Sequence, residues 1–142
     1  MKNNVLVLCM FCFLFMGCST GQLADGWYFI TDSKANAVDR SPIVTASDFA
    51  ALLLDSFPDA GHGTVSYQVI GKIKDNKVKA WADATEKAIG KQIGFMYNGE
   101  IISAPQVNMR IESGNFSISS KELLHDRQKM TEIFEQLKKK MN

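Results

Sequence analysis

Two histidines, His62 and His125, are the side chains of this 142-residue chain best suited to general acid–base catalysis. His62 lies between Gly61 and Gly63 in a polar loop, whereas His125 falls on the polar side of an expected C-terminal helix. We interpret both as solvated surface residues and keep His62 as the candidate base of a small hydrolase. After residue 18, the sequence contains no His-x-x-x-His, Cys-x-x-Cys, Gly-x-Ser-x-Gly or Walker-type loop. The sequence therefore predicts no catalytic residue, no metal site and no cofactor.

The N-terminus has the composition of a secretion signal. Lys2 supplies a positive charge, and residues 5–16 form an apolar run that is followed by Gly17 and Cys18. The run is shorter than the roughly 20 apolar residues that a bilayer-spanning helix needs. We predict that residues 1–17 are a signal peptide that directs export and is then removed.

Residues 15–18, with the sequence FMGC, resemble the lipobox of bacterial lipoproteins. The resemblance implies that the Cys18 thiol is acylated, that the signal is cut before it, and that membrane lipid is a partner of the mature chain. An uncleaved anchor and an ordinary signal peptide are the alternatives. Cys9 and Cys12 would leave with the signal, so the mature chain would have no disulfide. Ser19 favours the outer membrane, and the expected location is the bacterial cell envelope, lipid-anchored and facing the periplasm.

The composition of the mature chain indicates one domain without affinity for nucleic acid. Residues 18–25 form a short lipidated tether, and residues 26–142 are long enough to bury a single core. The whole chain has 16 Lys and Arg residues against 15 Asp and Glu residues, so removal of Lys2 brings the net charge to about zero. A nucleic-acid partner would require a basic excess.

Hydrophobic spacing predicts both strands and helices. Extended segments are expected at residues 26–31, 42–45, 64–74, 106–112 and 116–118, and helices at 48–56, 77–89 and 119–140. Ser47 caps the first helix, and Ser119 with Glu122 forms a capping box for the third. Gly71 marks a bulge or a close approach within its strand.

The clearest local signal is the Asn98-Gly99 pair between two β-rich runs, residues 92–97 and 100–104. This pair favours a type I′ turn and predicts a hairpin. Combined with the other elements, it gives an α+β fold: a mainly antiparallel β-sheet with about three helices packed on one face.

The stretch from Trp81 to Leu124 resembles the head subdomain of the first periplasmic domain of SecD, an accessory subunit of bacterial protein export. The resemblance rests on the order and spacing of these positions: Thr85, Gly90, Asn98, Gly99, Ser103, Ala104, Pro105 and Gly114. It implies a SecD-periplasmic-head-like fold in which these residues end helices and form turns rather than perform chemistry. SecD also has membrane helices that couple export to proton flow, and that function is not implied without them.

The leading hypothesis is a non-catalytic cell-envelope lipoprotein that binds unfolded polypeptide or an unidentified envelope protein. Segment 101–110, loosened by a proline, is the candidate binding edge, and the candidate contact residues are Ile102, Asn108 and Arg110. An inhibitor or immunity-type protein, which would show a contiguous exposed patch, is one alternative. A small hydrolase that depends on His62 is the other, and it requires a carboxylate or hydroxyl within hydrogen-bond reach of that ring.

Overall fold

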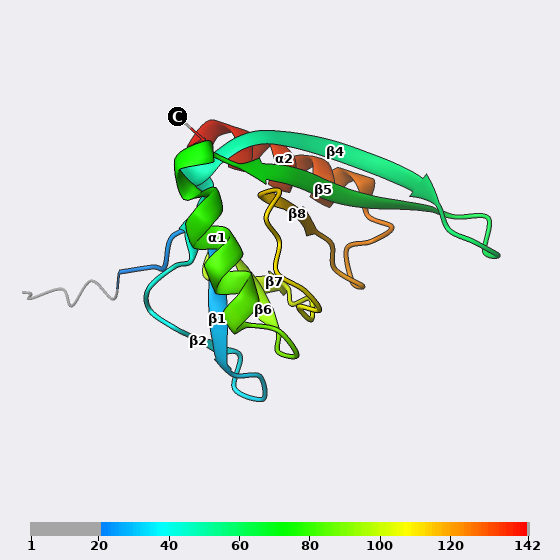
Figure 1. Ribbon diagram of the computed structural model, residues 1–142. Coiled ribbons are helices and arrows are strands. Elements are labelled where there is room, and N and C mark those ends of the chain that lie inside the picture. The colour runs from blue at the N-terminus through cyan, green and yellow to red at the C-terminus, as the bar shows by residue number, and fades with distance from the viewer. Residues whose placement is uncertain (1–20, 142) are drawn as a thin grey trace, which may run out of the picture.

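The computed structural model describes residues 21–141 of the chain (Figure 1). The predicted signal peptide and Cys18 lie outside the described residues. Along the chain the elements are β1 (Gly26–Asp32), β2 (Ala37–Val38), β3 (Val44–Thr45), a 3₁₀ turn (Ala46–Asp48), β4 (Phe49–Pro58), β5 (Val65–Ile73), α1 (Asp75–Lys87), β6 (Ile93–Tyr97), β7 (Glu100–Ser103), β8 (Asn115–Ile118) and α2 (Arg127–Lys140). No helix between residues 21 and 141 is long and apolar enough to span a bilayer.

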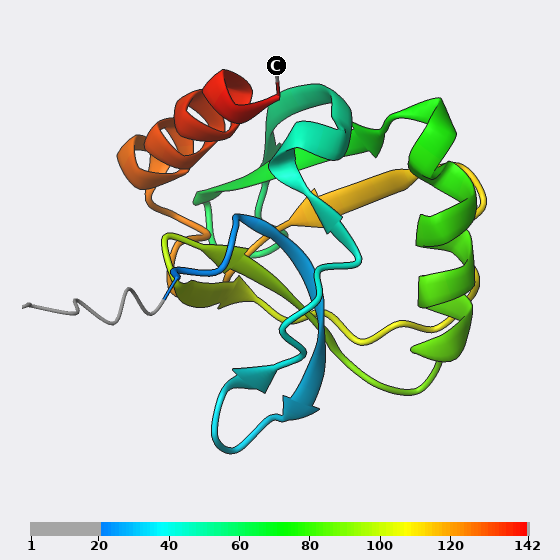
Figure 2. The same ribbon diagram turned by 90° about the vertical axis from the view of Figure 1, so that its left-hand side faces the viewer.

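The strands form two antiparallel sheets. One has the order β2-β1-β6-β7, with β3 also paired to β1, and the other has the order β4-β5-β8. Figure 2 shows α1 and α2 on opposite sides of the body. The predicted α+β fold with mainly antiparallel pairing is confirmed, but its division into two sheets was not predicted. The helix count of about three is wrong, because residues 21–141 contain two α-helices.

The helix predicted over residues 48–56 is wrong, because β4 occupies this segment. β4 pairs with β5 from Phe49 opposite Ile73 to Pro58 opposite Val65. Alanine and leucine favour a helix locally, but pairing with β5 places Phe49 in the core and overrides that preference. The only helical part of the predicted segment is the 3₁₀ turn that precedes β4. Its N-cap is Thr45 rather than Ser47, and the Thr45 N–H donates to Asp48 Oδ2 at 2.9 Å.

The helix predicted from residue 119 begins later, at Arg127. Its N-cap is Asp126, whose Oδ1 accepts from the Lys129 N–H at 2.9 Å. Ser119 does not cap a helix; its N–H donates to Ser103 Oγ at 3.4 Å. Residues 119–126 therefore form an irregular segment, and His125 lies before the helix rather than on it.

Most of the other predicted elements are confirmed. They are β1, β3, β5, β8, helix α1 with its stop at Gly90, and the β6–β7 hairpin. Residues 106–112 do not form a strand, because this segment makes isolated bridges at Val107 and Gln106. The two-residue strand β2 was not predicted, since it lies in what the sequence indicates as a polar loop.

Aromatic side chains from both sheets and from α1 fill the core. Ring centroids are 5.1 Å apart for Trp27 and Phe95, 4.5 Å for Phe49 and Phe116, and 5.8 Å for Trp27 and Trp81. All five residues are buried. Such edge and tilted contacts stabilise the domain beyond the area that they bury.

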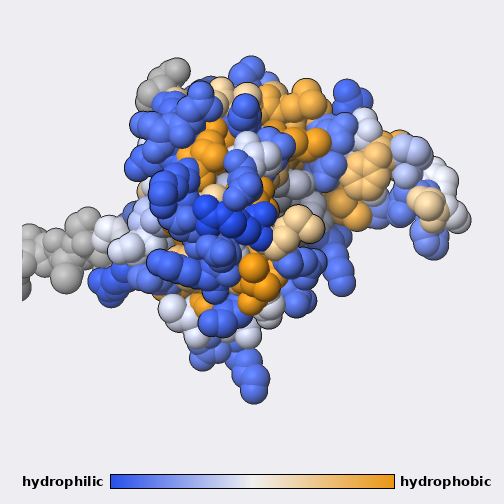
Figure 3. All heavy atoms as spheres, in the orientation of Figure 1, coloured by the Kyte–Doolittle hydropathy of each residue, from blue (hydrophilic) through white to orange (hydrophobic). Residues whose placement is uncertain are grey.

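The outer part of the β4–β5 hairpin, residues 56–67, extends beyond the body of the domain (Figure 1) and is referred to below as the arm. Phe57 and Val65 lie on it with 39% and 45% of their surfaces exposed, and Leu53 at its base is 60% exposed. Figure 3 shows the apolar atoms of the arm at the right of the molecule. His62 lies in the loop at its tip.

Candidate functional site

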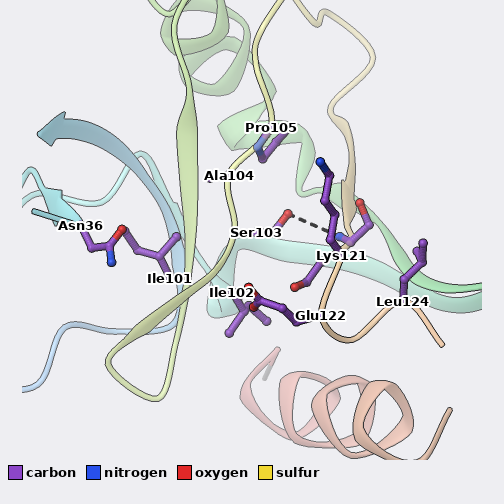
Figure 4. Close-up of a pocket in the computed structure, with 11 residues that line it drawn as sticks. Asn36, Ile101, Ile102, Ser103, Ala104, Pro105, Lys121, Glu122 and Leu124 are labelled. Atoms are coloured by element: carbon purple, nitrogen blue, oxygen red, sulfur yellow. Dashed lines mark hydrogen bonds between the residues drawn. The ribbon is translucent and has the colours of Figure 1, made fainter. Parts of the chain in front are cut away.

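The outer edge of β7 borders a groove. β7 is the last strand of its sheet, and within residues 21–141 it pairs with β6 alone. A cavity of about 490 Å³ lies along this edge, in the size range of roughly 300–1,000 Å³ that binding clefts occupy. Residues 101–105 form one wall and residues 119–122 with Leu124 form the other (Figure 4).

A bulge at Ile102 shapes the β7 wall of this groove. Met96 is opposite Ile101 and Phe95 is opposite Ser103, so Ile102 is an extra residue in β7. Figure 4 shows the Ile101 and Ile102 side chains on different sides of the strand, with the first near Asn36. Both are half-buried, so the groove offers apolar contacts as well as strand backbone.

The opposite wall is the irregular segment 119–124. It is fixed at one end by the Ser119 bond to Ser103 and at the other by the Tyr67 N–H, which donates to the Leu124 carbonyl at 2.7 Å. A second cavity of about 380 Å³ continues along β7 towards Tyr97 and also includes Lys129. Acidic and basic side chains line these cavities together, so the groove does not select one sign of charge.

The motif residues Ser103, Ala104 and Pro105 hold the chain as it leaves β7. Ser103 is 5% exposed and accepts the Ser119 bond, so it links the two walls. The Ala104 carbonyl accepts from Gln92 Nε2 at 2.8 Å, and the Pro105 carbonyl accepts from the Ile93 N–H at 3.2 Å. These contacts keep β7 against β6 while its other edge stays open.

The turn that connects β6 to β7 is the one that the sequence predicts. Asn98 has a φ of 48° and Gly99 a φ of 83°, as a type I′ turn requires at both central positions. The local dipeptide therefore sets the register of β7 up to Ile101, and the bulge at Ile102 sets it from Ser103 onwards.

Thr85 and Gly114 join α1 to the rest of the domain. Thr85 is fully buried; its Oγ1 donates to the Ala82 carbonyl at 3.0 Å and accepts from the Ile111 N–H at 2.9 Å. Gly114 has a φ of 73°, and its carbonyl accepts from the Ile73 N–H at 2.8 Å. A Cβ at residue 114 would lie 2.9 Å from a methyl of Val78, so glycine is required by both conformation and space.

The structure does not bring Asn108 and Arg110 to the β7 groove, where Ile102 lies. Asn108 lines a separate apolar cavity of about 320 Å³ beside Trp27 and Trp81. Arg110 Nη1 lies 2.9 Å from Asp83 Oδ1 on α1. The Arg110 guanidinium also contacts Glu86 Oε2 at 2.8 Å and Glu112 Oε1 at 3.2 Å, and it holds segment 105–114 against α1.

Lys79 and Arg110 hydrogen-bond the Asp83 carboxylate and lower its pKa, with Lys79 the larger cause. Because the Asp83 pKa is lowered, its ionised carboxylate stabilises the fold at any pH above the ordinary pKa of a carboxyl group. This stabilisation is lost as the pH falls through the pKa that Asp83 has in the folded protein. We expect Lys79→Ala to raise the Asp83 pKa more than Arg110→Ala does. A side-chain carboxyl NMR titration measures both; an unchanged pKa in both variants would contradict the assignment.

The two histidines lie apart and have no catalytic surroundings in the described residues. Within residues 21–141, no hydroxyl or carboxylate hydrogen-bonds the His62 ring, and no group of three His, Cys, Asp or Glu side chains could hold a metal. His125 Nδ1 lies 3.2 Å from the Val65 carbonyl.

Sequence reasoning missed the second wall of the groove, residues 119–124, because it assigned them to a helix. The sequence does contain a signal for the later start, since Asp126 directly before the helix is a preferred N-cap residue. The arm was missed for the same reason, since its first strand was assigned to a helix.

Taken together, two antiparallel sheets, two flanking helices and an open edge strand define a small α+β domain. A family model described as SecDF, P1 head subdomain, matches residues 26–132, and the chain belongs to this family. The predicted resemblance is therefore confirmed.

Two solved structures of SecDF share the fold. One, from a study of SecDF as a membrane component that enhances protein export, has a TM-score of 0.56 and 23% identity; the alignment covers 70% of this chain and 41% of that chain. The other, SecDF in a super-membrane-facing form, has a TM-score of 0.55 and 24% identity. This alignment covers 68% of this chain and 12% of that chain. The chain thus spans less than half of either SecDF chain. No curated protein sequence matches it significantly.

Proposed function

We propose that this protein is a lipid-anchored, non-catalytic accessory factor that holds extended polypeptide at the β7 edge. The observation that carries the proposal is the unpaired edge of β7 beside a groove of about 490 Å³. An edge strand presents backbone N–H and C=O groups that an extended chain pairs with, and side-chain pockets then add affinity.

The groove suits a sequence-tolerant partner. Ile101 and Ile102 supply apolar contact, whereas Lys121 and Glu122 on the opposite wall place both signs of charge within reach. Recognition would depend on the backbone, which every polypeptide offers, and less on particular side chains. This is the behaviour expected of a factor that handles many exported proteins or the extended segment of an envelope protein.

The family supports a role in protein export. SecDF is a membrane component that enhances protein export, and this chain shares the fold of its P1 head subdomain. The chain covers only 41% of one SecDF chain and 12% of the other. We therefore propose for this protein only that it binds polypeptide, and not that it has the activity of the whole SecDF protein.

Attachment through Cys18 would keep the domain at a membrane of the cell envelope, with the outer membrane favoured by Ser19. We expect Cys18→Ala to abolish acyl labelling and to leave a slower-migrating, unprocessed precursor. Metabolic labelling with a palmitate analogue and gel migration measure this. Normal processing of the variant would exclude the lipobox assignment.

Removal of one outward backbone donor tests the β7 edge. Tyr97 and Glu100 flank a two-residue turn and pair with each other, so the next N–H, that of Ile101, points away from β6. Proline at an edge position keeps the strand but removes the donor. We expect Ile101→Pro to weaken binding of a fluorescent unfolded polypeptide about fivefold, the cost of one hydrogen bond of about 1 kcal/mol.

Ile101→Ala is the matched control, because it shortens the same side chain and retains the N–H. Circular dichroism and thermal unfolding establish that both variants are folded, and fluorescence anisotropy measures affinity. If Ile101→Pro and Ile101→Ala bind equally well, backbone pairing at β7 is not the mode of binding.

One observation favours a second candidate, an inhibitor-type protein that contacts a folded partner through the arm. Leu53 and Phe57 are exposed apolar side chains on one face of β4, and Val65, opposite Pro58, is an exposed apolar side chain on the other face of the arm. Crosslinked pull-down of the anchored protein distinguishes the two. Recovery of one stoichiometric enzyme, lost in Phe57→Glu and retained in Ile101→Pro, would favour the inhibitor.

A further inference from the structure

The start of the domain is fixed to the end of α2. Asp25 is 6% exposed, and its Oδ2 accepts from Lys140 Nζ at 2.5 Å, although the residues are 115 positions apart in the sequence. Its Oδ1 accepts from the Asn98 N–H at 2.8 Å. The beginning of β1, the β6–β7 turn and the last turn of α2 therefore lie at one end of the molecule.

The chain before Asp25 is already against this end of the domain. The Gln22 side chain lies over Gly99, with Nε2 3.2 Å from the place that a Cβ on that glycine would take. Four residue steps separate Cys18 from Gln22, which is at most about 14 Å of extended chain. An acylated Cys18, which is part of the proposed function, would bring this end of the domain to the bilayer surface.

Lysines are concentrated at the same end. Lys138, Lys139 and Lys140 form the exposed last turn of α2, and Lys74 Nζ lies 3.4 Å from the Met141 carbonyl. Asp25 balances Lys140, but within residues 21–141 neither Lys138 nor Lys139 has a carboxylate partner. Among residues 21–141, these two cationic side chains thus lack a carboxylate partner where the tether reaches the domain, although Lys138 Nζ lies 5.2 Å from the centroid of the Phe134 ring.

The arm lies at the other side of the domain from the described start of the chain, which is at the left of Figure 1. If the left-hand side faces the bilayer, the arm extends away from it. Figure 2 views the domain from that side and shows the last turn of α2 and the beginning of β1 there.

We propose that the last turn of α2, residues 138–140, docks on anionic phospholipid headgroups and orients the anchored domain with its arm directed away from the bilayer. The tether supplies proximity, and Lys138 and Lys139 supply charge complementarity to the headgroups. Each lysine at an anionic surface changes the docked-to-undocked ratio by about fivefold.

Fluorescence quenching by a headgroup nitroxide lipid tests this orientation. The full chain is expressed, processed and reconstituted into vesicles of phosphatidylethanolamine and phosphatidylglycerol, or of phosphatidylcholine alone. A dye is attached at Glu135→Cys on α2 or at Ala60→Cys near the arm tip, both exposed positions. Because Cys18 would be acylated, the introduced cysteine is the reactive thiol.

We expect strong quenching at position 135 and little at position 60 in phosphatidylglycerol vesicles. Lys138→Glu with Lys139→Glu should lower the docked-to-undocked ratio by at least about 25-fold and should have little effect in phosphatidylcholine. Raising the salt from about 0.05 M to about 0.5 M should also release the domain. The matched control is Lys87→Glu with Lys91→Glu, an equal charge change at the far end of α1.

Equal quenching at positions 135 and 60 would overturn the proposal. So would a control pair, Lys87→Glu with Lys91→Glu, that lowers the docked-to-undocked ratio as much as Lys138→Glu with Lys139→Glu does. Vesicle flotation reports separately on the anchor. A chain that floats but shows no difference between the two dyes refutes the orientation and leaves the proposed anchor standing. A chain that does not float refutes the anchor, and the orientation with it.

Discussion

Replacing Gly71 by alanine is expected to lower the free energy of unfolding by about 3 kcal/mol, the upper part of the range for an overpacked core. A Cβ on residue 71 would lie 2.1 to 2.7 Å from three ring carbons of Phe116. That ring is confined by Phe49 at 4.5 Å and Trp27 at 6.0 Å between centroids. The aromatic cluster must therefore shift as a unit, and chemical denaturation measures the cost.

Gly94→Ala is the matched control, since this glycine also lies in a central strand. Its Cβ would lie 3.3 to 3.5 Å from Cγ1 and Cδ1 of Ile30 and Cγ2 of Ile101, contacts that a shift of a few tenths of an ångström relieves, and we expect a loss below about 1 kcal/mol. In a Phe116→Leu background the cost of Gly71→Ala should fall, because the ring atoms that clash are gone. Equal losses at both glycines would show that Phe116 does not set the cost.

Asp25→Ala is expected to destabilise the domain by about 3 kcal/mol. The substitution leaves the Asn98 N–H without its acceptor and Lys140 without its partner, and the Asp25 side chain is 3% exposed. Removing the buried carboxylate leaves the Asn98 N–H without an acceptor and also loses the charge-assisted bond to Lys140, whose side chain is 44% exposed and can be solvated. Thermal unfolding at neutral pH measures the effect, and it should be accompanied by weaker packing of the last turn of α2.

Asp83→Ala is the control, because the Asp83 carboxylate also has two partners, Lys79 and Arg110, but is 40% exposed. Exposed pairs contribute up to about 1 kcal/mol, since water and salt screen them. Equal losses for the two substitutions would mean that burial of Asp25 is not what gives its contacts their strength.

Local sequence signals were sufficient to predict an element where its backbone conformation requires a particular residue type. Asn98-Gly99 predicts its turn because both residues take a positive φ, and Gly90 predicts the end of α1 for the same reason. The pattern of β5 predicts both the strand and the close approach at Gly71. These features depend on a few neighbouring residues, and the structure confirms them.

The candidate site was predicted in part. Segment 101–110 contains all of β7 except Glu100, together with the motif residues that hold it, so one wall of the groove lies where the sequence indicates. Arg110 and Asn108 lie elsewhere because the chain turns back towards α1 after Pro105. The opposite wall could not be placed, since residues 119–124 take their position from Ser103 and Tyr67, which are distant in the sequence.

The sequence by itself determined the family, the turns, the larger part of the secondary structure and the prediction of a lipid anchor at Cys18. The tertiary structure decided that residues 49–58 are a strand, because pairing with β5 outweighs the helical preference of alanine and leucine. It also decided that α2 starts at Arg127 and that Asp25 meets Lys140 across 115 positions. Local propensities are worth tenths of a kcal/mol per residue, whereas burial and long-range pairing contribute more and depend on residues that meet only in the folded chain.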